Sequence, residues 1–458
     1  MATASWFFDT LDQQIFILFR QTALEHLMPA GTSPTVIKSY AGYSASVFVM
    51  GWALGGLIFG SLGDRYGRAR MLTVTVLLYS VFTGLSALSQ GWVDFAIYRF
   101  ITGLGVGGVF GLAVALIADS LPDHSRPGAL GSLQAISGIG NISAALISMG
   151  IGQLIRSGTL SADLAWKLAF LIGALPAFLC VFIQLRLREP EKWLKARATK
   201  RPEGTQLGSY ISLLGMPRWR RPALLGMVLC IAGVVGLWGV GFFSFELVSD
   251  VITNSLREQG MTGKAIQGAA QFWKSMNGIV FNGGAFLGML SLTYLAQAAG
   301  RKPAFVVAFS GALISTLAYF TWFNGVGSVW MSAVMGFFQL GLFACFAIYL
   351  PELFPTQLRS TGTSFCYNVG RFLAASGPFT LGMLQEAMAK GVSDTAEKLA
   401  AFRHACQWMS LIFLLGLLML FFLPETKGQP LPEDPEPSDE PKQSDKKPLT
   451  IHLNGIRQ

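Results

Sequence analysis

Long apolar runs alternate with short polar segments along almost the whole chain. A bilayer core about 30 Å thick is crossed by about 20 apolar residues in a helix. The runs of this length lie at about 5–28, 41–62, 70–89, 94–118, 129–154, 166–187, 222–247, 272–296, 303–323, 327–350, 361–386 and 401–423. The pattern therefore predicts an all-α membrane protein with twelve transmembrane helices, of which the first carries the most charged residues.

The polar segments divide these spans into two equal groups. The longest internal polar segment, 188–221, is basic, and we expect it to be a cytoplasmic linker between a six-helix bundle in 1–187 and a second in 222–423. Residues 424–458 are rich in Pro, Glu, Asp and Lys and contain few apolar residues. This composition predicts a disordered cytoplasmic tail.

Composition agrees with a lipid-embedded chain and excludes several other classes. Only 13% of the residues are charged, whereas soluble domains carry about 25%. All five cysteines lie inside apolar runs, which excludes a disulfide framework and a zinc site. The net charge of +9 comes from basic residues in short loops, a distribution that argues against nucleic-acid binding. We expect no metal and no cofactor.

The distribution of Lys and Arg predicts the orientation. If both termini are cytoplasmic, the inner loops hold 17 basic residues and the outer loops with their edges hold nine. This is the bias that cytoplasmic loops show. With compact loops and no added domain, the chain is expected to be a monomer in the cytoplasmic membrane of a bacterium, with both ends inside.

An internal repeat relates the two halves. The segments Asp119 to Arg126 and Glu352 to Arg359 both read acid-x-x-Pro-x-x-x-Arg, and they are 233 residues apart. The same offset relates further pairs: Gly67 with Gly300, Arg68 with Arg301, Gly51 with Gly284, Gly55 with Gly288, Gly103 with Gly336 and Gly108 with Gly341. Two similar halves of this kind are typical of transporters that rock two bundles about a central site.

Several spans also contain glycines four residues apart. Gly103, Gly107 and Gly111 form one such series, and Gly51 with Gly55 forms another. Small residues at this spacing let membrane helices approach closely. We interpret them as packing positions.

The loop after the second span carries a motif. It reads Gly60-Ser-Leu-Gly-Asp64-Arg65-Tyr-Gly67-Arg68-Ala-Arg70 and resembles the signature loop of the major facilitator superfamily. Further segments resemble the sugar-porter branch and related metabolite:proton symporters: Tyr98-Arg99 before a glycine series, the Pro122 and Arg126 box, Glu189-Pro-Glu-Lys-Trp193-Leu and Pro424-Glu425-Thr-Lys427-Gly. The resemblance runs from about Phe8 to Gly428 and implies the fold of that superfamily.

The charged residues of these motifs form a candidate conformational clasp. Its expected members are Gly60, Asp64, Arg65, Gly67, Arg68, Asp119, Arg126, Glu189, Glu352, Arg359 and Glu425. An acid such as Asp64 can cap a helix N-terminus and pair with basic neighbours, which would hold one of two rocking states closed. The alternative is a basic loop that only sets topology. Gln297 stands at the aspartate's place in the second half, so we expect any clasp there to be weaker.

Charged residues within spans need a partner or a function, because each costs at least about 2.5–3.5 kcal/mol to insert. Arg99 lies inside the fourth span, and the resemblance implies an acid of the first span as its partner in proton coupling. Asp9 matches the site of that acid, and Asp12 is the alternative proton carrier. A fixed ion pair between Asp9 and Arg99 is the competing interpretation.

Two residues of the fifth span are candidate substrate ligands. Gln134 and Asn141 are seven residues apart and so share one face. They match positions at which sugar porters bind their substrate, although they could equally join helices. In the seventh span, Trp238 stands near the usual asparagine of a sugar porter, which weakens a sugar assignment.

Residues of the eleventh predicted span indicate an anionic substrate. Tyr367, Asn368 and Arg371 form a polar patch at i, i+1 and i+4. A guanidinium that faces a central cavity suits a carboxylate, which it can bind through two hydrogen bonds. The alternative is that Arg371 neutralises an acid on another helix.

These features favour a secondary transporter that works by alternating access. We expect proton-coupled symport of a small organic anion, a carboxylate or sugar acid, with the substrate, protons and the lipid bilayer as partners. A proton-coupled neutral sugar transporter is the first alternative, and a non-transporting sensor derived from a transporter is the second. Four scattered histidines and no nucleophile or phosphate loop argue against an enzyme.

Overall fold

Helices account for the regular secondary structure of the part of the chain that the structure describes. The computed structural model describes residues 2–175, 188–198, 207–260, 264–374 and 395–432, and these ranges contain helices and no strand. The first half comprises α1 (Ala2–Leu27), α2 (Pro34–Tyr66), α3 (Arg68–Ser86), α4 (Trp92–Ser120), α5 (Arg126–Arg156) and α6 (Ala162–Gly173). Two short helices follow, α8 (Glu191–Ala198) and α9 (Tyr210–Gly215). The all-α prediction is confirmed.

The second half has the same plan. It comprises α10 (Pro217–Trp238), η1 (Gly241–Phe243), α11 (Ser244–Glu258), α12 (Lys264–Ala298), α13 (Arg301–Trp322), η2 (Val326–Ser328), α14 (Met331–Glu352), η3 (Thr356–Leu358), α15 (Arg359–Ala374), α17 (Thr395–Ser410) and α18 (Ile412–Met419). The predicted seventh span is therefore interrupted, since α10 ends at Trp238 before the short turn η1.

Most of the predicted spans are long and apolar enough to cross a membrane. Nine stretches of helix within the described ranges meet both conditions. The other three predicted spans coincide with α1, which contains several charged residues, and with α6 and α15, whose described parts have 12 and 16 residues. The remainders of the sixth and eleventh spans lie outside the described residues, as does most of the tail predicted to be disordered.

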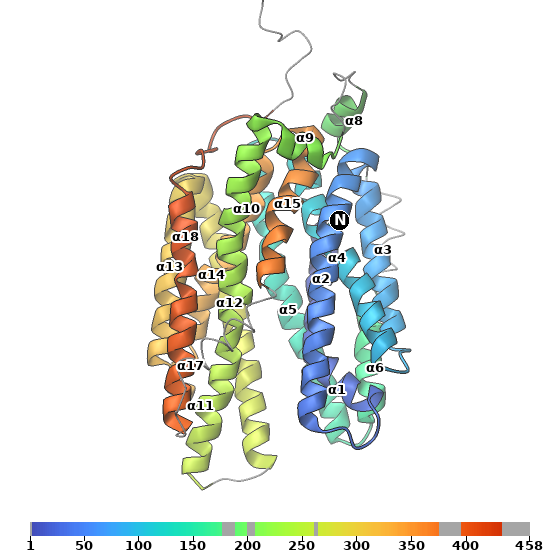
Figure 1. The fold of residues 1–458 in the computed structure, drawn as a ribbon, viewed down its shortest axis with the longest axis vertical. Helices are drawn as coiled ribbons and strands as arrows, with labels where there is room; N and C mark the ends of the chain where they lie inside the picture. The colour runs from blue at the N-terminus through green and yellow to red at the C-terminus, as the bar shows by residue number, and fades with distance from the viewer. Residues whose placement is uncertain (1, 176–187, 199–206, 261–263, 375–394, 433–458) are drawn as a thin grey trace, which may run out of the picture.

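The helices form two bundles whose most extensive contacts with each other lie along two helix pairs (Figure 1). The blue to teal helices of the first half lie on one side and the green to red helices of the second half on the other, with α5 and α15 between them. Contacts between the halves join α2 with α15 and α5 with α12. The repeat relates α2 to α12 and α15 to α5, so these two interfaces are equivalent pairs.

Glycines allow close packing inside each bundle. A Cβ added at Gly51 would meet the carbonyl of Phe100, and one added at Gly55 would meet the backbone of Leu104. In the second half, Gly284 meets Ala333 and Gly288 meets Phe337, at the same offset of 233 residues. The packing interpretation of the glycine series is confirmed, and the sequence repeat is a repeat of helix contacts.

Large apolar side chains also cover the outer surface of the bundles. Examples are Leu287 on α12, Ile314 on α13 and Phe421 after α18, which are 59%, 66% and 82% exposed. So many large exposed apolar side chains are unusual on helices that face water. They fit a surface that faces lipid.

Candidate functional site

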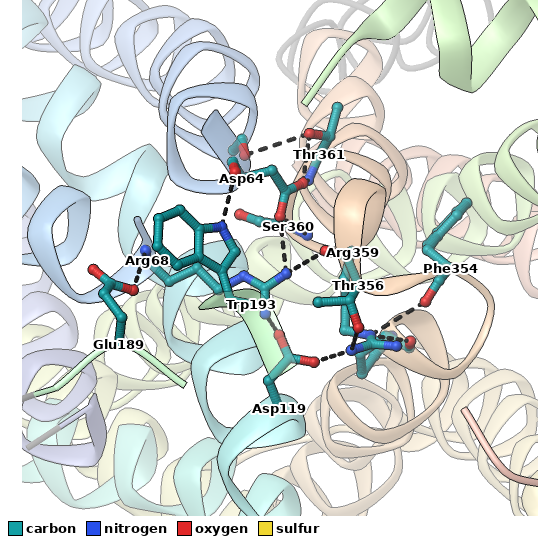
Figure 2. Close-up of polar contacts among 12 residues, drawn as sticks. Asp64, Arg68, Asp119, Glu189, Trp193, Phe354, Thr356, Arg359, Ser360 and Thr361 are labelled. Atoms are coloured by element: carbon teal, nitrogen blue, oxygen red, sulfur yellow. Dashed lines mark hydrogen bonds and ion pairs between the residues drawn. The ribbon is translucent and has the colours of Figure 1, made fainter. Parts of the chain in front are cut away.

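Asp64, Arg68, Asp119, Glu189 and Arg359 lie together where the ends of α2 and α4 meet the start of α15, and we call this region the clasp end (Figure 2). There Gly67 makes the turn between α2 and α3 with a φ of 117°, a conformation that favours glycine. The carboxylate of Glu189 accepts hydrogen bonds from the backbone N–H groups of Arg68, Ala69 and Arg70 at 2.8, 3.2 and 3.1 Å. Glu189 thus caps the N-terminus of α3.

Asp64 joins the two halves. Its carboxylate pairs with Arg68 of its own half at 3.0 Å. It also accepts hydrogen bonds from the N–H and hydroxyl of Thr361 at 2.8 and 2.7 Å, and from the N–H of Ser360 at 3.3 Å. Asp64 therefore caps the N-terminus of α15, a helix of the other half, as Figure 2 shows. Gly60, one turn earlier, leaves room for this contact because an added Cβ would meet Ser364.

Asp119 makes the second connection between the halves. Its carboxylate forms ion pairs with Arg68 of the first half and with Arg359 of the second (Figure 2). Arg359 also donates to the carbonyls of Pro351 and Phe354 at 3.2 Å each. All three charged side chains of this bridge are completely buried. Buried ion pairs of this kind hold two elements together only while every partner is present.

The chain between the halves also contacts the clasp end. Trp193 of α8 donates from its indole to the carbonyl of Asp64 at 2.8 Å. Arg65 donates to the carbonyl of Leu207 at 3.1 Å. Tyr210 of α9 donates to the carbonyl of Leu57 at 2.6 Å. The predicted linker is therefore packed against α2.

The second half has a corresponding group of charges, but it stays within that half. Arg301 binds Glu352 through two hydrogen bonds of 2.6 and 3.1 Å. Glu425 accepts from the N–H groups of Arg301 and Lys302 at 2.9 Å each and so caps α13. Burial raises the pKa of Glu425, but backbone N–H donors outweigh this effect and hold the pKa below its ordinary value.

The clasp is one-sided because its second copy lacks the groups that cross between halves. Gln297, at the aspartate's place, donates to the carbonyl of Thr293 on its own helix. Pro127 stands where Ser360 offers an N–H, and proline has none. Arg126 pairs with Asp123 in its own loop. The structure agrees with a weaker second clasp.

A buried arginine, Arg371, lies between aromatic rings in the last turn of α15. The guanidinium of Arg371 lies 3.9 Å from the ring centre of Trp52 and 4.3 Å from that of Tyr367. It donates to the carbonyl of Tyr367 at 3.2 Å and to the side-chain oxygen of Asn368 at 3.1 Å. Trp238 packs edge-on against Trp52 at 5.7 Å. Arg371 and Trp238 thus both contact Trp52, a residue of the other half, while Tyr367 and Asn368 contact Arg371.

The two acids of α1 have different partners. The charge of Arg371 acts on Asp9, and Gln13 donates to one Asp9 oxygen at 2.9 Å. The charge of Arg99 acts on Asp12. Within the described residues Arg99 bonds to Ser86 and Phe82 and forms no ion pair with either acid, so the fixed ion pair of Asp9 with Arg99 does not occur there, and the choice between Asp9 and Asp12 as proton carrier stays a prediction. Along α1, Asp12 lies about 4.5 Å beyond Asp9 at 1.5 Å per residue.

Arg99 is enclosed by neutral groups. Its guanidinium donates to the hydroxyl of Ser86 at 3.0 and 2.7 Å and to the carbonyl of Phe82 at 3.3 Å. The rings of Phe16 and Phe170 lie 5.5 and 5.0 Å from it. Arg99 is fully buried, and these neighbours all belong to the first half.

The two predicted ligands on α5 do not share one environment. Asn141 donates to the side-chain oxygen of Asn282 on α12 at 2.9 Å, which joins the two halves and fits the interpretation as a helix contact. Gln134 is buried, and its side-chain oxygen has no hydrogen-bond partner. No contact between these two residues and Arg371 occurs in the part of the chain that the structure describes.

Sequence reasoning missed several participants. Trp52, Ser86 and Asn282 each lie in an apolar span, where a single aromatic or polar residue has no distinctive spacing. Gln13 was recognisable, because it stands four residues after Asp9 on one helix face. The others depend on how distant helices pack.

The structure consists of two related bundles. They meet at buried ion pairs at the clasp end and around the buried Arg371. This arrangement defines a membrane transporter of the two-bundle class. Residues 5–378 match the family described as the Major Facilitator Superfamily. The chain belongs to the major facilitator superfamily and is a transporter, not an enzyme.

The relatives and solved structures that resemble this chain are also transporters. A cis,cis-muconate transport protein of Acinetobacter baylyi is 26% identical over 393 residues, which cover 85% of this chain and 86% of the relative. The niacin transporter NiaP of the same species is 27% identical over 410 residues, covering 82% and 84%. The structure of the proton:xylose symporter XylE is 20% identical, with a TM-score of 0.70 and coverage of 94% and 96%. This last likeness concerns the fold.

Proposed function

We propose that the protein is a proton-coupled symporter of a small organic anion, a carboxylate or sugar acid. The observation that carries the proposal is Arg371. It is buried between the two halves, and within the described residues its hydrogen bonds go to neutral oxygens of its own helix. A guanidinium so placed can bind a carboxylate, and its charge would favour one strongly over a neutral solute.

The names of two relatives support an anionic substrate. They are named for transport of muconate and niacin, which are a carboxylate pair on a diene and a carboxylate on a pyridine ring. Flat conjugated anions of this kind also suit the aromatic rings of Trp52 and Tyr367 beside Arg371. A neutral sugar is the second candidate, favoured by the fold shared with a xylose symporter and by the unpartnered oxygen of Gln134.

Alternating access follows from the one-sided clasp. With the clasp end in the cytoplasm, as the Lys and Arg bias favours, Asp64 and Asp119 close the inner side of the transporter. Opening requires both carboxylates to leave their partners in the second half. In this arrangement the protein acts as a monomer in a bacterial inner membrane with both termini inside.

Uptake into proteoliposomes tests the proposal. The purified chain is offered cis,cis-muconate, nicotinate, gluconate and xylose, with and without an imposed proton gradient that is acidic outside. We expect accumulation of at least one of the three anions above its outside concentration, only with the gradient. Accumulation of xylose alone would support the sugar alternative, and no uptake of any of the four would contradict the proposed symporter.

The clasp gives a separate expectation. Asp64→Asn removes the charge that binds Arg68 and the N-terminus of α15, at a cost of about 1–3 kcal/mol to the closed state. Uptake of the accumulated anion is therefore expected to slow about tenfold while the amount of protein in the membrane stays unchanged. The matched control is Glu191→Gln, which removes an exposed acid from nearby α8. Equal uptake rates in Asp64→Asn and wild type would contradict a role for the clasp.

A further inference from the structure

A cluster of arginines lies where α10 begins. Arg218, Arg220 and Arg221 are close to the N-terminus of this helix, and all three are exposed. The guanidinium of Arg218 lies 4.7 Å from the ring centre of Trp219. None of the three arginines forms an ion pair with any residue that the structure describes. The positive charges of 218–221 therefore lack a counter-charge within the described ranges.

Exposed apolar side chains border these arginines. The short helix α9 directly precedes α10, and its Ile211 is 84% exposed. On α10, Leu224 is 42% exposed and lies four residues after Arg220, about 6 Å further along the same face at 1.5 Å per residue. We call residues 210–224, which contain these side chains and the arginines, the corner. The corner presents positive charge and exposed apolar side chains together.

The level of the corner in a membrane follows from α10. This helix is long and apolar enough to cross a membrane, and the arginines stand at the end of it that lies near α8 (Figure 1). The exposed Leu224 then faces the acyl chains of the lipids, and the arginines one turn earlier face their headgroups. With the orientation that the Lys and Arg bias favours, these lipids belong to the inner leaflet.

Contacts to both halves hold the corner in place. The hydroxyl of Tyr210 donates to the carbonyl of Leu57 on α2 at 2.6 Å, and the Tyr210 ring lies 6.3 Å from that of Phe365 on α15. Further along the corner, the carbonyl of Ala223 accepts from the thiol of Cys366 on α15 at 3.3 Å. The backbone that carries the arginines is therefore fixed before any partner binds, which lowers the cost of binding.

We propose that the corner binds the headgroup of an anionic phospholipid, with the phosphate on the arginines and an acyl chain beside Leu224. Guanidinium groups donate paired hydrogen bonds to phosphate oxygens, and basic side chains next to a transmembrane helix attract anionic lipids. A nucleic acid or an acidic protein would match the charge but not the exposed apolar side chains at the same level. A phospholipid carries both chemistries at this spacing.

Lipid binding to the purified full chain tests the proposal. The protein in detergent is titrated with phosphatidylglycerol or with phosphatidylcholine, and bound lipids are counted by native mass spectrometry. Each basic residue near an anionic surface strengthens binding about fivefold, so three arginines should favour phosphatidylglycerol about a hundredfold. Equal affinity of wild type for the two lipids would overturn the proposal.

Substitution of the three arginines by glutamine tests the place of binding. In the variant R218Q/R220Q/R221Q, the affinity for phosphatidylglycerol is expected to fall to that for phosphatidylcholine. The lysine variant R218K/R220K/R221K keeps the charge, so it should retain most of the binding, and it serves if the glutamine variant folds poorly. Wild-type affinity in the glutamine variant, or complete loss of binding in the lysine variant, would contradict the proposal.

The matched control removes the same charge from three exposed residues of α8, in the variant K192Q/K195Q/R197Q. This variant should bind phosphatidylglycerol as wild type does. Equal losses in the α8 and corner variants would show a response to net charge alone and would overturn the proposed site.

Two further measurements distinguish the lipid from other occupants. Glycerophosphoglycerol, which is the headgroup without acyl chains, should bind far more weakly than the lipid, and equal binding would indicate a site for soluble anions instead. A chain that ends at Pro432 lacks the acidic residues of 433–458 and should bind phosphatidylglycerol as wild type does. Binding that arises only in this shortened chain would make the tail the occupant of the corner and would overturn the proposal.

Discussion

Replacing Arg371 by alanine is expected to weaken anion uptake at least about thirtyfold. The substitution removes the guanidinium that lies between Trp52 and Tyr367. Removing one partner of a buried charged interaction costs about 2–5 kcal/mol. Each 1.4 kcal/mol corresponds to about a tenfold change in affinity.

Substitution of Arg371 by lysine distinguishes the contribution of the positive charge to anion uptake from that of the planar guanidinium. Arg371→Lys keeps the positive charge but loses the planar group that stacks on both rings and donates two parallel hydrogen bonds. Its uptake is expected to fall between wild type and alanine. The measurement is the initial rate of uptake of nicotinate and cis,cis-muconate into proteoliposomes over a range of concentrations. Arg257→Gln, which removes an exposed arginine of α11, is the control. Full anion uptake in Arg371→Ala would remove the basis of the anion assignment.

The repeat made much of the fold predictable. The offset of 233 residues relates Gly51 and Gly284 in the sequence, and in the structure each lies against the equivalent position of a neighbouring helix. A repeat of sequence implies a repeat of helix contacts because small residues are needed wherever two backbones approach. The apolar runs likewise located the spans, since bilayer thickness fixes their length.

The partners of the buried charges were not predictable in the same way. Helical spacing gives the face on which Asp9, Asp12 or Arg371 lies, but not which helix packs on that face. The choice between Asp9 and Asp12 as partner of Arg99 depends on the relative depth of α1 and α4, and no local signal encodes that depth. The same holds for Asp64, whose place at the N-terminus of α15 depends on how the halves dock.

The asymmetry of the clasp was partly predictable from the sequence. Gln297 in place of an aspartate already indicated a weak second copy. Pro127 and Gly128 stand where Ser360 and Thr361 bind Asp64, so one N–H and the hydroxyl of that contact are missing there, and Arg126 is bound within its own loop. Closure at the clasp end therefore depends on one set of contacts, between the end of α2 and α4 and the start of α15.

This dependence makes Asp119 the residue whose loss should affect closure most. In Asp119→Asn, Arg359 loses the carboxylate that compensates its buried charge, and Arg68 keeps only Asp64. Breaking a buried ion pair by neutralising one partner costs about 3–5 kcal/mol. A shift of about 3 kcal/mol changes the ratio of closed to open forms more than about a hundredfold. The variant is expected to open at the clasp end and to lose most gradient-driven accumulation.

Distance measurements between spin labels on α2 and α15 at the clasp end test this expectation. Wild type should be mostly closed, and Asp119→Asn should shift to the longer distance. Asp123→Asn is the matched control, because Asp123 lies in the same loop, is 66% exposed and pairs only with Arg126 within the described residues. The double variant Asp119→Asn with Arg359→Gln should regain part of the closed population, because it no longer buries an uncompensated guanidinium. An unchanged distance distribution in Asp119→Asn would show that closure rests on other contacts.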